Sequence, residues 1–281
     1  MITDWESNFV YFADTLPKKH PRFFRALERV LKRRKIAYGL LPGTKAIWCR
    51  DYMPIQVSRK SFVQFQYKPS YLKTKEELAT ITDTASVCKA IGIKPVVSDI
   101  KLDGGNLVRS KDRAIMTDQV FSENPGYSKK ALIRELKSLL RLKHVVMLPK
   151  HEDDKFGHAD GMMRFVGDGK KEVGILMNDY SRESRGFKNA IYRSFEEEKM
   201  PFLFLSYDPY NNKTSLDSTG IYINYLQVGQ TIIYPIYGLP SDTLARKKLL
   251  YDFGSNAVPL MAREIAEEGG VLNCISWNIR A

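Results

Sequence analysis

The sequence predicts a single α/β domain in which five similar units are arranged in a ring. Three observations support this prediction. A succession of helix, strand, polar loop and further strand recurs about every fifty residues along the 281-residue chain. Each unit places polar or reactive side chains in a comparable loop, and no Pro/Ser-rich or low-complexity linker separates the units. We therefore treat residues 1–281 as one domain.

Amphipathic segments supply the five expected helices. Their expected ranges are residues 21–34, 78–88, 128–141, 186–198 and 242–253. In the first segment the expected inward stripe is Phe23, Leu27, Val30 and Leu31, while arginines and lysines fill the opposite face. In the second segment the residues expected to face inward are Leu78, Ile81, Ala85 and Cys88. Each segment can therefore bury one apolar face against a neighbouring sheet.

A short apolar strand follows each expected helix. These strands are expected at residues 37–41, 94–98, 144–149, 202–207 and 257–261. A polar loop and a further strand then end each unit. The closing segment 269–277 ends the fifth unit, and the opening segment 7–13 is expected to complete the sheet of that unit.

The loop at the end of each unit carries side chains that can take part in chemistry. In chain order these are Arg50 and Asp51, then Asp103, then His158 and Asp160, then Asn224, and finally Cys274. If the units form a ring, the five loops meet at its centre. Cys274 lies only seven residues from the last residue, where chains ordinarily fray. Neighbouring units of the ring would hold it in place.

The composition indicates a globular protein. Hydrophobic residues make up 43% of the chain, which is enough for a substantial core at this length. No apolar run approaches the length of about 18 residues that a membrane span needs. The start MITDWESNF lacks the pattern of a signal peptide. We therefore expect a cytoplasmic protein without a membrane partner. Cys49, Cys88 and Cys274 form no CxxC pair and are expected to be reduced thiols.

The net charge of +12, from 44 basic and 32 acidic residues, raises the question of a nucleic-acid partner. Basic residues occupy mainly the solvated faces of the expected helices. The sequence contains no zinc-finger spacing, RNP-type aromatic pattern or Gly-rich phosphate loop. Nucleic-acid binding is therefore not expected as the primary function, and the oligomeric state is left open.

The candidate side chains suit an attack on a guanidinium group. An ionised cysteine is a strong nucleophile, and a nearby histidine lowers the cysteine pKa and protonates a leaving group. Asp51 and Asp160 would oppose ionisation of Cys274, so we expect these carboxylates to hold a cation. A guanidinium has a planar fork that donates paired hydrogen bonds to two carboxylates, and its central carbon would face the thiolate.

Five sequence fragments follow one another in an order typical of one enzyme family. They are WCRDYMP, DGGN, FGHADGMMRF, GIYINYL and the closing GG…NC. Together they resemble the successive signatures of the agmatine deiminase and Porphyromonas-type peptidylarginine deiminase family, within the guanidine-modifying pentein superfamily. The resemblance covers nearly the whole chain. It implies a five-bladed α/β propeller of pseudo-symmetric ββαβ units that hydrolyses a guanidino group to a ureido group and ammonia, with no metal and no cofactor.

The resemblance also implies roles for the matching residues. Cys274 takes the position of the nucleophile, and His158 takes that of the general acid/base. Asp51 and Asp160 take the positions of the guanidinium clamp. Asp103 stands at the acidic residue that precedes the Gly-Gly pair and orients the histidine.

Other residues of the same fragments have structural or substrate-binding interpretations. Asn224 matches the asparagine of the G-x-Y-x-N segment and is a substrate-binding candidate. Trp48 is a candidate for stacking on substrate, or else a core aromatic. Arg50 is expected to brace the site through an internal salt bridge. Gly104 and Gly105 are expected to permit a close approach that a side chain would block, and Cys49 and Cys88 are expected to be packing residues.

The chain also departs from the family pattern. Asp103 stands where family members have Glu, Asn273 replaces a His, and ISWNIRA replaces a Gln-rich tail. The usual tryptophan-rich opening segment is not recognisable. These differences preserve the reaction type and leave the substrate open between a small guanidine and the arginine side chain of a peptide. We favour agmatine or a similar small alkylguanidine, because the expected compartment and the order of motifs outweigh the global charge.

Two other function classes remain open. The stretch HEDDKFGHAD resembles a metal-ligand cluster through His151, Glu152, Asp153, Asp154, His158 and Asp160. It lacks the H-E-x-x-H spacing of a metal hydrolase helix. A basic binding module that keeps the fold without activity is the other class. An assay for ammonia and ureido product, with and without chelator, separates all three.

Overall fold

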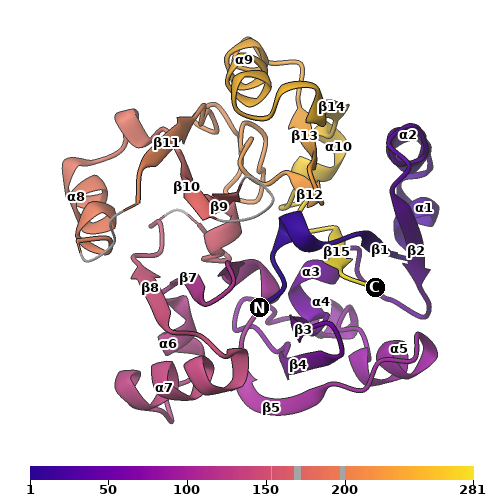
Figure 1. Cartoon of the computed structure of the whole chain (residues 1–281), viewed down its shortest axis with the longest axis vertical. Coiled ribbons are helices and arrows are strands. Elements are labelled where there is room, and N and C mark those ends of the chain that lie inside the picture. Colours follow the sequence, from indigo (N-terminus) through magenta and orange to yellow (C-terminus); the bar gives the residue numbers. More distant parts are fainter. Residues whose placement is uncertain (153, 168–171, 197–199) are drawn as a thin grey trace.

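In the described part of the chain, five three-stranded sheets surround a central axis, and their helices lie on the outside of the ring (Figure 1). The computed structural model describes residues 1–152, 154–167, 172–196 and 200–281. The sheets follow one another around the ring in chain order (Figure 1). This arrangement is the five-bladed α/β propeller that the sequence predicts.

Four of the sheets share one connectivity, in which an antiparallel hairpin is followed by a helical segment and by a strand parallel to the second strand of the hairpin. Their strands are β3 (Ile55–Ser58), β4 (Ser61–Gln66) and β5 (Val96–Lys101); β6 (Val108–Arg109), β7 (Arg113–Thr117) and β8 (His144–Leu148); β9 (Met163–Gly167), β10 (Glu172–Asn178) and β11 (Phe202–Leu205); and β12 (Leu226–Val228), β13 (Thr231–Ile236) and β14 (Ala257–Met261). A parallel pair requires a crossover connection, which the outer helices provide.

The remaining sheet joins the two ends of the described chain. β15 (Ser276–Ile279) pairs antiparallel with β1 (Phe9–Ala13), and β1 pairs in parallel with β2 (Ala37–Leu41). The expected pairing of the opening and closing segments is therefore confirmed. The expectation that 257–261 shares their sheet is wrong, because β14 pairs with β13. Each expected unit starts at a helix, whereas each sheet starts at a hairpin. The strands of one expected unit therefore belong to two neighbouring sheets.

Helices cover the outside of the ring, and all of them except α4 bury apolar side chains. They are α1 (Leu16–Lys19), α2 (Pro21–Arg33), α4 (Lys75–Ala79), α5 (Thr84–Ala90), α6 (Gln119–Glu123), α7 (Lys129–Leu140), α8 (Arg185–Arg193), α9 (Asp242–Phe253) and α10 (Arg263–Ala266). In α2, Phe23, Leu27 and Leu31 of the predicted stripe are buried, and Val30 is partly buried. The fourth helix ends earlier than expected, and residues 197–198 of its expected range lie outside the described residues. No described helix has both the length and the apolar composition needed to cross a bilayer.

The expectation of a single helix at residues 78–88 is wrong. The chain forms two short helices there, because two N-caps start separate turns. The Thr74 side chain accepts a hydrogen bond from Glu77 N, and the Asp83 side chain accepts one from Ser86 N. Cys88 is buried as expected, but Leu78 is 44% exposed and Ala85 is also exposed.

Short helical turns connect neighbouring sheets near the axis. They are α3 (Cys49–Tyr52) between β2 and β3, η2 (Gly104–Asn106) between β5 and β6, and η3 (Ala159–Gly161) between β8 and β9. Further short turns are η1 (Asp4–Glu6), η4 (Tyr180–Arg182) and η5 (Gly254–Asn256). The connecting turns contain or directly follow the polar residues that the sequence placed in its loops.

The strands β3, β6, β9, β12 and β15, which directly follow the five loops, each contribute a buried polar side chain near the axis. These side chains are Gln56, Arg109, Arg164, Gln227 and Asn278. Asp4 of η1 joins them: Arg109 Nη2 and Asn278 Nδ2 each donate to Asp4 Oδ1 at 2.9 Å, and Arg164 Nη2 donates to Asp4 Oδ2. Burial opposes the ionised carboxyl, but the arginines outweigh it and hold the pKa of Asp4 well below its usual range. Sequence reasoning did not identify this cluster.

We predict that Asp4→Asn destabilises the fold by about 3–5 kcal/mol, because it leaves buried guanidinium groups without their carboxylate. Urea denaturation measures the change in the free energy of unfolding. Asp99→Asn, which removes an exposed carboxylate of β5, is the control and should stay within about 0.5 kcal/mol of the wild type. An Asp4→Asn effect as small as that of the control would show that Asp4 does not stabilise the axis.

Candidate active site

The five predicted loops converge at the axis. Each one joins the last strand of one sheet to the first strand of the next, so each begins at the outside of the ring and returns to its centre. The structure brings the side chains of Asp51, Asp103, His158, Asp160 and Cys274 into one cluster, as the contacts below show.

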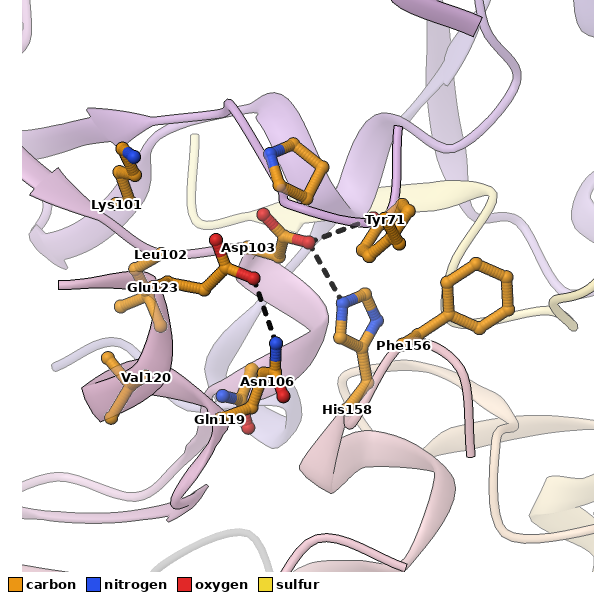
Figure 2. A pocket seen from close by; sticks show the side chains of 11 residues that line it. Tyr71, Lys101, Leu102, Asp103, Asn106, Gln119, Val120, Glu123, Phe156 and His158 are labelled. Carbon is orange, nitrogen blue, oxygen red and sulfur yellow. Dashed lines mark hydrogen bonds and ion pairs between the residues drawn. The ribbon is translucent and has the colours of Figure 1, made fainter. Parts of the chain in front are cut away.

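His158 lies between two carboxylates. Its Nε2 is 3.1 Å from Asp103 Oδ2, which Figure 2 shows, and its Nδ1 is 3.6 Å from Asp51 Oδ1. Burial disfavours the imidazolium, but the charges of Asp51, Asp103 and Asp160 outweigh it and raise the pKa of His158 to about 10. The shorter side chain of Asp103 thus reaches the histidine, and the surrounding carboxylates favour the protonated form of His158.

Glycines allow this close approach. A β-carbon at Gly105 would lie 2.5 Å from His158 Nδ1 and 2.7 Å from Asp51 Oδ1, and one at Gly104 would lie 2.1 Å from the carbonyl oxygen of Arg50. A side chain at either position would therefore clash with these atoms, as the sequence predicted. Gly105 N also donates a 3.1 Å hydrogen bond to Asp51 Oδ1. Burial raises the pKa of Asp51 to about 7 despite the nearby imidazolium.

Cys274 lies in an acidic, nearly dry environment. Its Sγ is 3.4 Å from Asn224 Oδ1 and 4.0 Å from Asp160 Oδ2, and the residue is only 8% exposed. Burial, followed by the charges of Asp160 and Asp51, raises the pKa of the thiol well above its ordinary value. The resting cysteine is therefore a neutral thiol.

Asn224 holds the backbone that carries the cysteine. Its Oδ1 accepts a 3.0 Å hydrogen bond from Asn273 N, and its carbonyl oxygen is 3.2 Å from the same nitrogen. Arg50 N donates to the carbonyl oxygen of Cys274 at 3.1 Å. The chain end around Cys274 is thus tied to two neighbouring segments of the ring.

Sequence reasoning noted Asn273 only as a departure from the family pattern, but its side chain links two site residues. Asn273 Nδ2 donates to Asp160 Oδ2 at 2.6 Å, and its Oδ1 accepts from Arg50 Nη2 at 3.1 Å. Arg50 Nη2 also donates to Asn278 Oδ1 at 2.8 Å. Arg50 therefore braces the site through hydrogen bonds to amides, where we had expected a salt bridge.

The remaining candidates of the WCRD fragment lie at the edge of the site or in the core. Trp48 is half-buried, and a β-carbon at Gly270 would lie 2.6 Å from its Cζ3, so the indole packs against the glycine pair that precedes Cys274. Cys49 and Cys88 are buried in one apolar cluster. Burial raises the pKa of Cys49 to about 12 and that of Cys88 to about 11. These two cysteines are packing residues, as expected.

A cavity of about 610 Å³ opens onto the cluster. Four of the candidate residues line it, namely His158, Asp160, Asn224 and Cys274. Its lining also carries both signs of charge, with Asp154, Glu183, Asp217, Arg182 and Lys213. This volume falls in the range of small-molecule sites, which is about 300–1,000 Å³.

The stretch that resembled a metal-ligand cluster is spread over several contacts. His151 Nε2 is 3.2 Å from Glu183 Oε2, and Asp154 Oδ1 accepts a 2.8 Å hydrogen bond from Phe156 N. Asp153 lies outside the described residues. Within the described ranges, no group of three or more His, Cys, Asp or Glu side chains is arranged to hold a metal ion.

Comparison with known proteins agrees with this fold. Residues 25–279 match the Porphyromonas-type peptidyl-arginine deiminase family, and the chain belongs to that family. The agmatine deiminase of Pseudomonas aeruginosa is 24% identical over 208 residues, which cover 63% of this chain and 56% of that protein. A Listeria monocytogenes protein provisionally named agmatine deiminase 1 is 27% identical over 216 residues, 65% of this chain and 59% of that protein. The matches thus span less than two thirds of these relatives.

Solved structures show the same fold. The agmatine deiminase of C. jejuni superposes with a TM-score of 0.79 at 15% identity and covers 100% of this chain and 95% of that chain. The agmatine deiminase of Enterococcus faecalis gives a TM-score of 0.75 at 16% identity, over 99% of this chain and 94% of that one. The propeller described above is therefore the pentein fold of these enzymes.

We predict that His158 keeps its proton through neutral pH and titrates near pH 10, above the ordinary value of 6.5. Asp51→Asn should lower this pKa, because it removes the largest contribution that favours the imidazolium. NMR titration of the histidine ring carbons measures both values. Asp99→Asn should leave the His158 pKa unchanged. An ordinary His158 pKa in the wild type would contradict the described geometry.

Proposed function

We propose that this protein deiminates a guanidino group to a ureido product and ammonia. One observation carries the proposal: a thiol, two carboxylates and an imidazolium from three different loops meet at the axis, where a cavity opens. The carboxylates of Asp51 and Asp160 add negative charge around the buried thiol of Cys274, and this charge favours a cationic ligand. A guanidinium fits this arrangement, since it supplies a positive charge, a planar set of donors and an electrophilic carbon.

Binding of the substrate would also activate the nucleophile. The pKa of Cys274 is raised by burial and by the charges of Asp160 and Asp51. A guanidinium bound between these carboxylates offsets their charge and adds a positive charge beside the sulfur, so the thiol loses its proton to solvent. The thiolate would therefore form mainly when a cationic substrate is present.

The chemical steps use the groups that the structure places together. The Cys274 thiolate attacks the central carbon of the guanidinium and forms a tetrahedral adduct. His158 donates its proton to one amino group, the C–N bond breaks, and ammonia leaves a thiouronium cation on the sulfur. Neutral His158 then takes a proton from a water molecule, whose oxygen attacks the same carbon. Collapse of this second adduct breaks the C–S bond, releases the ureido product and a proton, and restores the thiolate.

Asp103 would fix the direction of the proton transfer. It holds Nε2 of His158, while Nδ1 lies on the side of Asp51. We assign the transferred proton to Nδ1, because Asp51 is the carboxylate that would bind the guanidinium beside it. Asp51 and Asp160 would thus bind the substrate, and Asp103 would orient the histidine that protonates the leaving group.

We propose agmatine or a similar small alkylguanidine as the substrate. The family membership and the names of the relatives support a guanidine, and several relatives are agmatine deiminases. The alternative is the arginine side chain of a peptide, which the family name and the roomy cavity favour. Charges of both signs at the cavity lining can meet either an amine or a carboxylate at the far end of the substrate.

We further propose that the protein acts in the cytoplasm. Its three cysteines are free thiols, and the closing segment carries one of them at the site. A nucleophilic thiol is preserved best in a reducing compartment. In an oxidising compartment the same thiol would be exposed to disulfide exchange.

We predict that Cys274→Ala abolishes turnover and that a chelator leaves the wild type fully active. The reason is that the proposed reaction needs a covalent bond to sulfur and no metal. Ammonia release and ureido product, measured for the wild type and the variant, test both parts. Cys49→Ala and Cys88→Ala serve as controls, because these cysteines pack in the core. Activity that survives Cys274→Ala but disappears with chelator would favour the metal-hydrolase alternative.

The carboxylate clamp generates a second prediction about activity. Asp51→Asn and Asp160→Asn should each cost about 2–5 kcal/mol, or roughly 30- to 4,000-fold in kcat/KM, because each variant leaves a buried guanidinium with half of its partners. Steady-state kinetics with agmatine measures the effect, with Asp99→Asn as the control. Normal kinetic constants in both variants would show that these carboxylates do not bind the substrate.

Competition between substrates decides the choice of guanidine. We predict a higher kcat/KM for agmatine than for free arginine or for an internal arginine of a peptide. The measurement is ureido product formed from mixtures of the three at known concentrations. A higher kcat/KM for the peptide would contradict the small-molecule preference and leave the deimination reaction intact.

A further inference from the structure

Tyr71 makes a contact with the site that the proposed reaction does not use. Its hydroxyl donates a 2.9 Å hydrogen bond to Asp103 Oδ2, the same oxygen that lies 3.1 Å from His158 Nε2 (Figure 2). The three side chains thus form a row, in which the carboxylate of Asp103 stands between a neutral donor and the imidazolium. Figure 2 shows them together at the wall of a small pocket next to the larger cavity.

The loop that carries Tyr71 is fixed at several points. It joins β4 to α4, and Ser70 N donates to Glu123 Oε2 at 3.1 Å, which ties the loop to α6 of the next sheet. The ring of Tyr71 packs edge-on against Phe156, with the ring centres 5.0 Å apart. Phe156 lies two residues before His158, so the same aromatic contact supports both ends of the row.

We propose that Tyr71 is a positioning residue for the deimination reaction proposed above. Its hydroxyl fixes the carboxylate of Asp103 against Nε2 of His158 and takes up part of the charge that the carboxylate would otherwise direct at the imidazolium. Two donors on one oxygen restrict the carboxylate more closely than one donor does. Because Tyr71 donates to the same oxygen, Asp103 stabilises the proton on His158 less strongly. His158 must donate this proton and later regain it.

The surroundings keep Tyr71 in the donor form. Burial, followed by the charge of Asp103, raises the pKa of its hydroxyl well above the ordinary value of 10.0. Other titratable groups that face the row or line its pocket are Asp51, Asp160, Tyr67, Lys101 and Glu123. The substitutions tested below leave all of these groups in place.

The test compares the wild type with Tyr71→Phe, which removes the hydroxyl and keeps the ring. We expect kcat to fall about tenfold while KM for agmatine stays within about twofold, because the described lining of the larger cavity does not include Tyr71. The basic limb of the kcat–pH profile should move upward by about 0.5–1 pH unit, because Asp103 then directs its full charge at His158. Tyr38→Phe is the matched control, since Tyr38 also donates to a carboxylate, Glu28, but far from the site.

A second measurement keeps this inference separate from the proposed function. NMR titration of His158, one of four histidines in the chain and identified by the signal missing in His158→Gln, should give a higher pKa in Tyr71→Phe than in the wild type. If no guanidine is turned over, the proposed function fails, and the titration still decides the role of Tyr71. An unchanged His158 pKa, or a lower thermal midpoint with an unshifted pH profile, would overturn the proposal and leave Tyr71 as a packing residue.

Discussion

The carboxylate of Asp4 is the first link in a chain of hydrogen bonds that runs from the axis of the propeller to the cavity. Asn278 Nδ2 donates to Asp4, and Asn278 Oδ1 accepts from Arg50. Arg50 donates to the side chain of Asn273, which in turn donates to Asp160. Buried guanidinium groups gather around Asp4, and each would be costly without a carboxylate. The bonds that hold the blades together therefore also orient a carboxylate of the proposed clamp.

The site at the other end of this chain is built around an excess of negative charge. Asp51, Asp103 and Asp160 surround the imidazolium of His158, and Arg50 and Arg164 add positive charge near Asp160. The charges of Asp160 and Asp51 favour the protonated form of Cys274. Stability alone would favour fewer buried charges, so the arrangement is better explained by the cation that it would bind. The same carboxylates would then bind the cation, couple the ionisation of the thiol to that binding and keep a proton on His158.

Much of this could be predicted from the sequence, because local patterns define it. The strand at 37–41 and the helix at 242–253 have the predicted bounds, and the loop residues converge as the repetition implied. The roles of Tyr71, Asn273 and Asp4 could not be predicted. Each depends on partners brought together from distant blades, and tyrosine and asparagine have no spacing rule that reveals such contacts. A usable signal existed for the axis: a buried polar side chain recurs in β3, β6, β9, β12 and β15, at intervals close to that of the repeated units.

Covalent capture of the substrate by Cys274 is the central claim of this account, and rapid acid quenching followed by peptide mass spectrometry tests it most directly. During turnover of agmatine, the peptide that contains Cys274 should carry an adduct with the mass of the substrate less ammonia. The adduct should appear before the ureido product and should be absent in Cys274→Ala. Steady turnover with no adduct on Cys274, or with the adduct on another residue, would contradict the account.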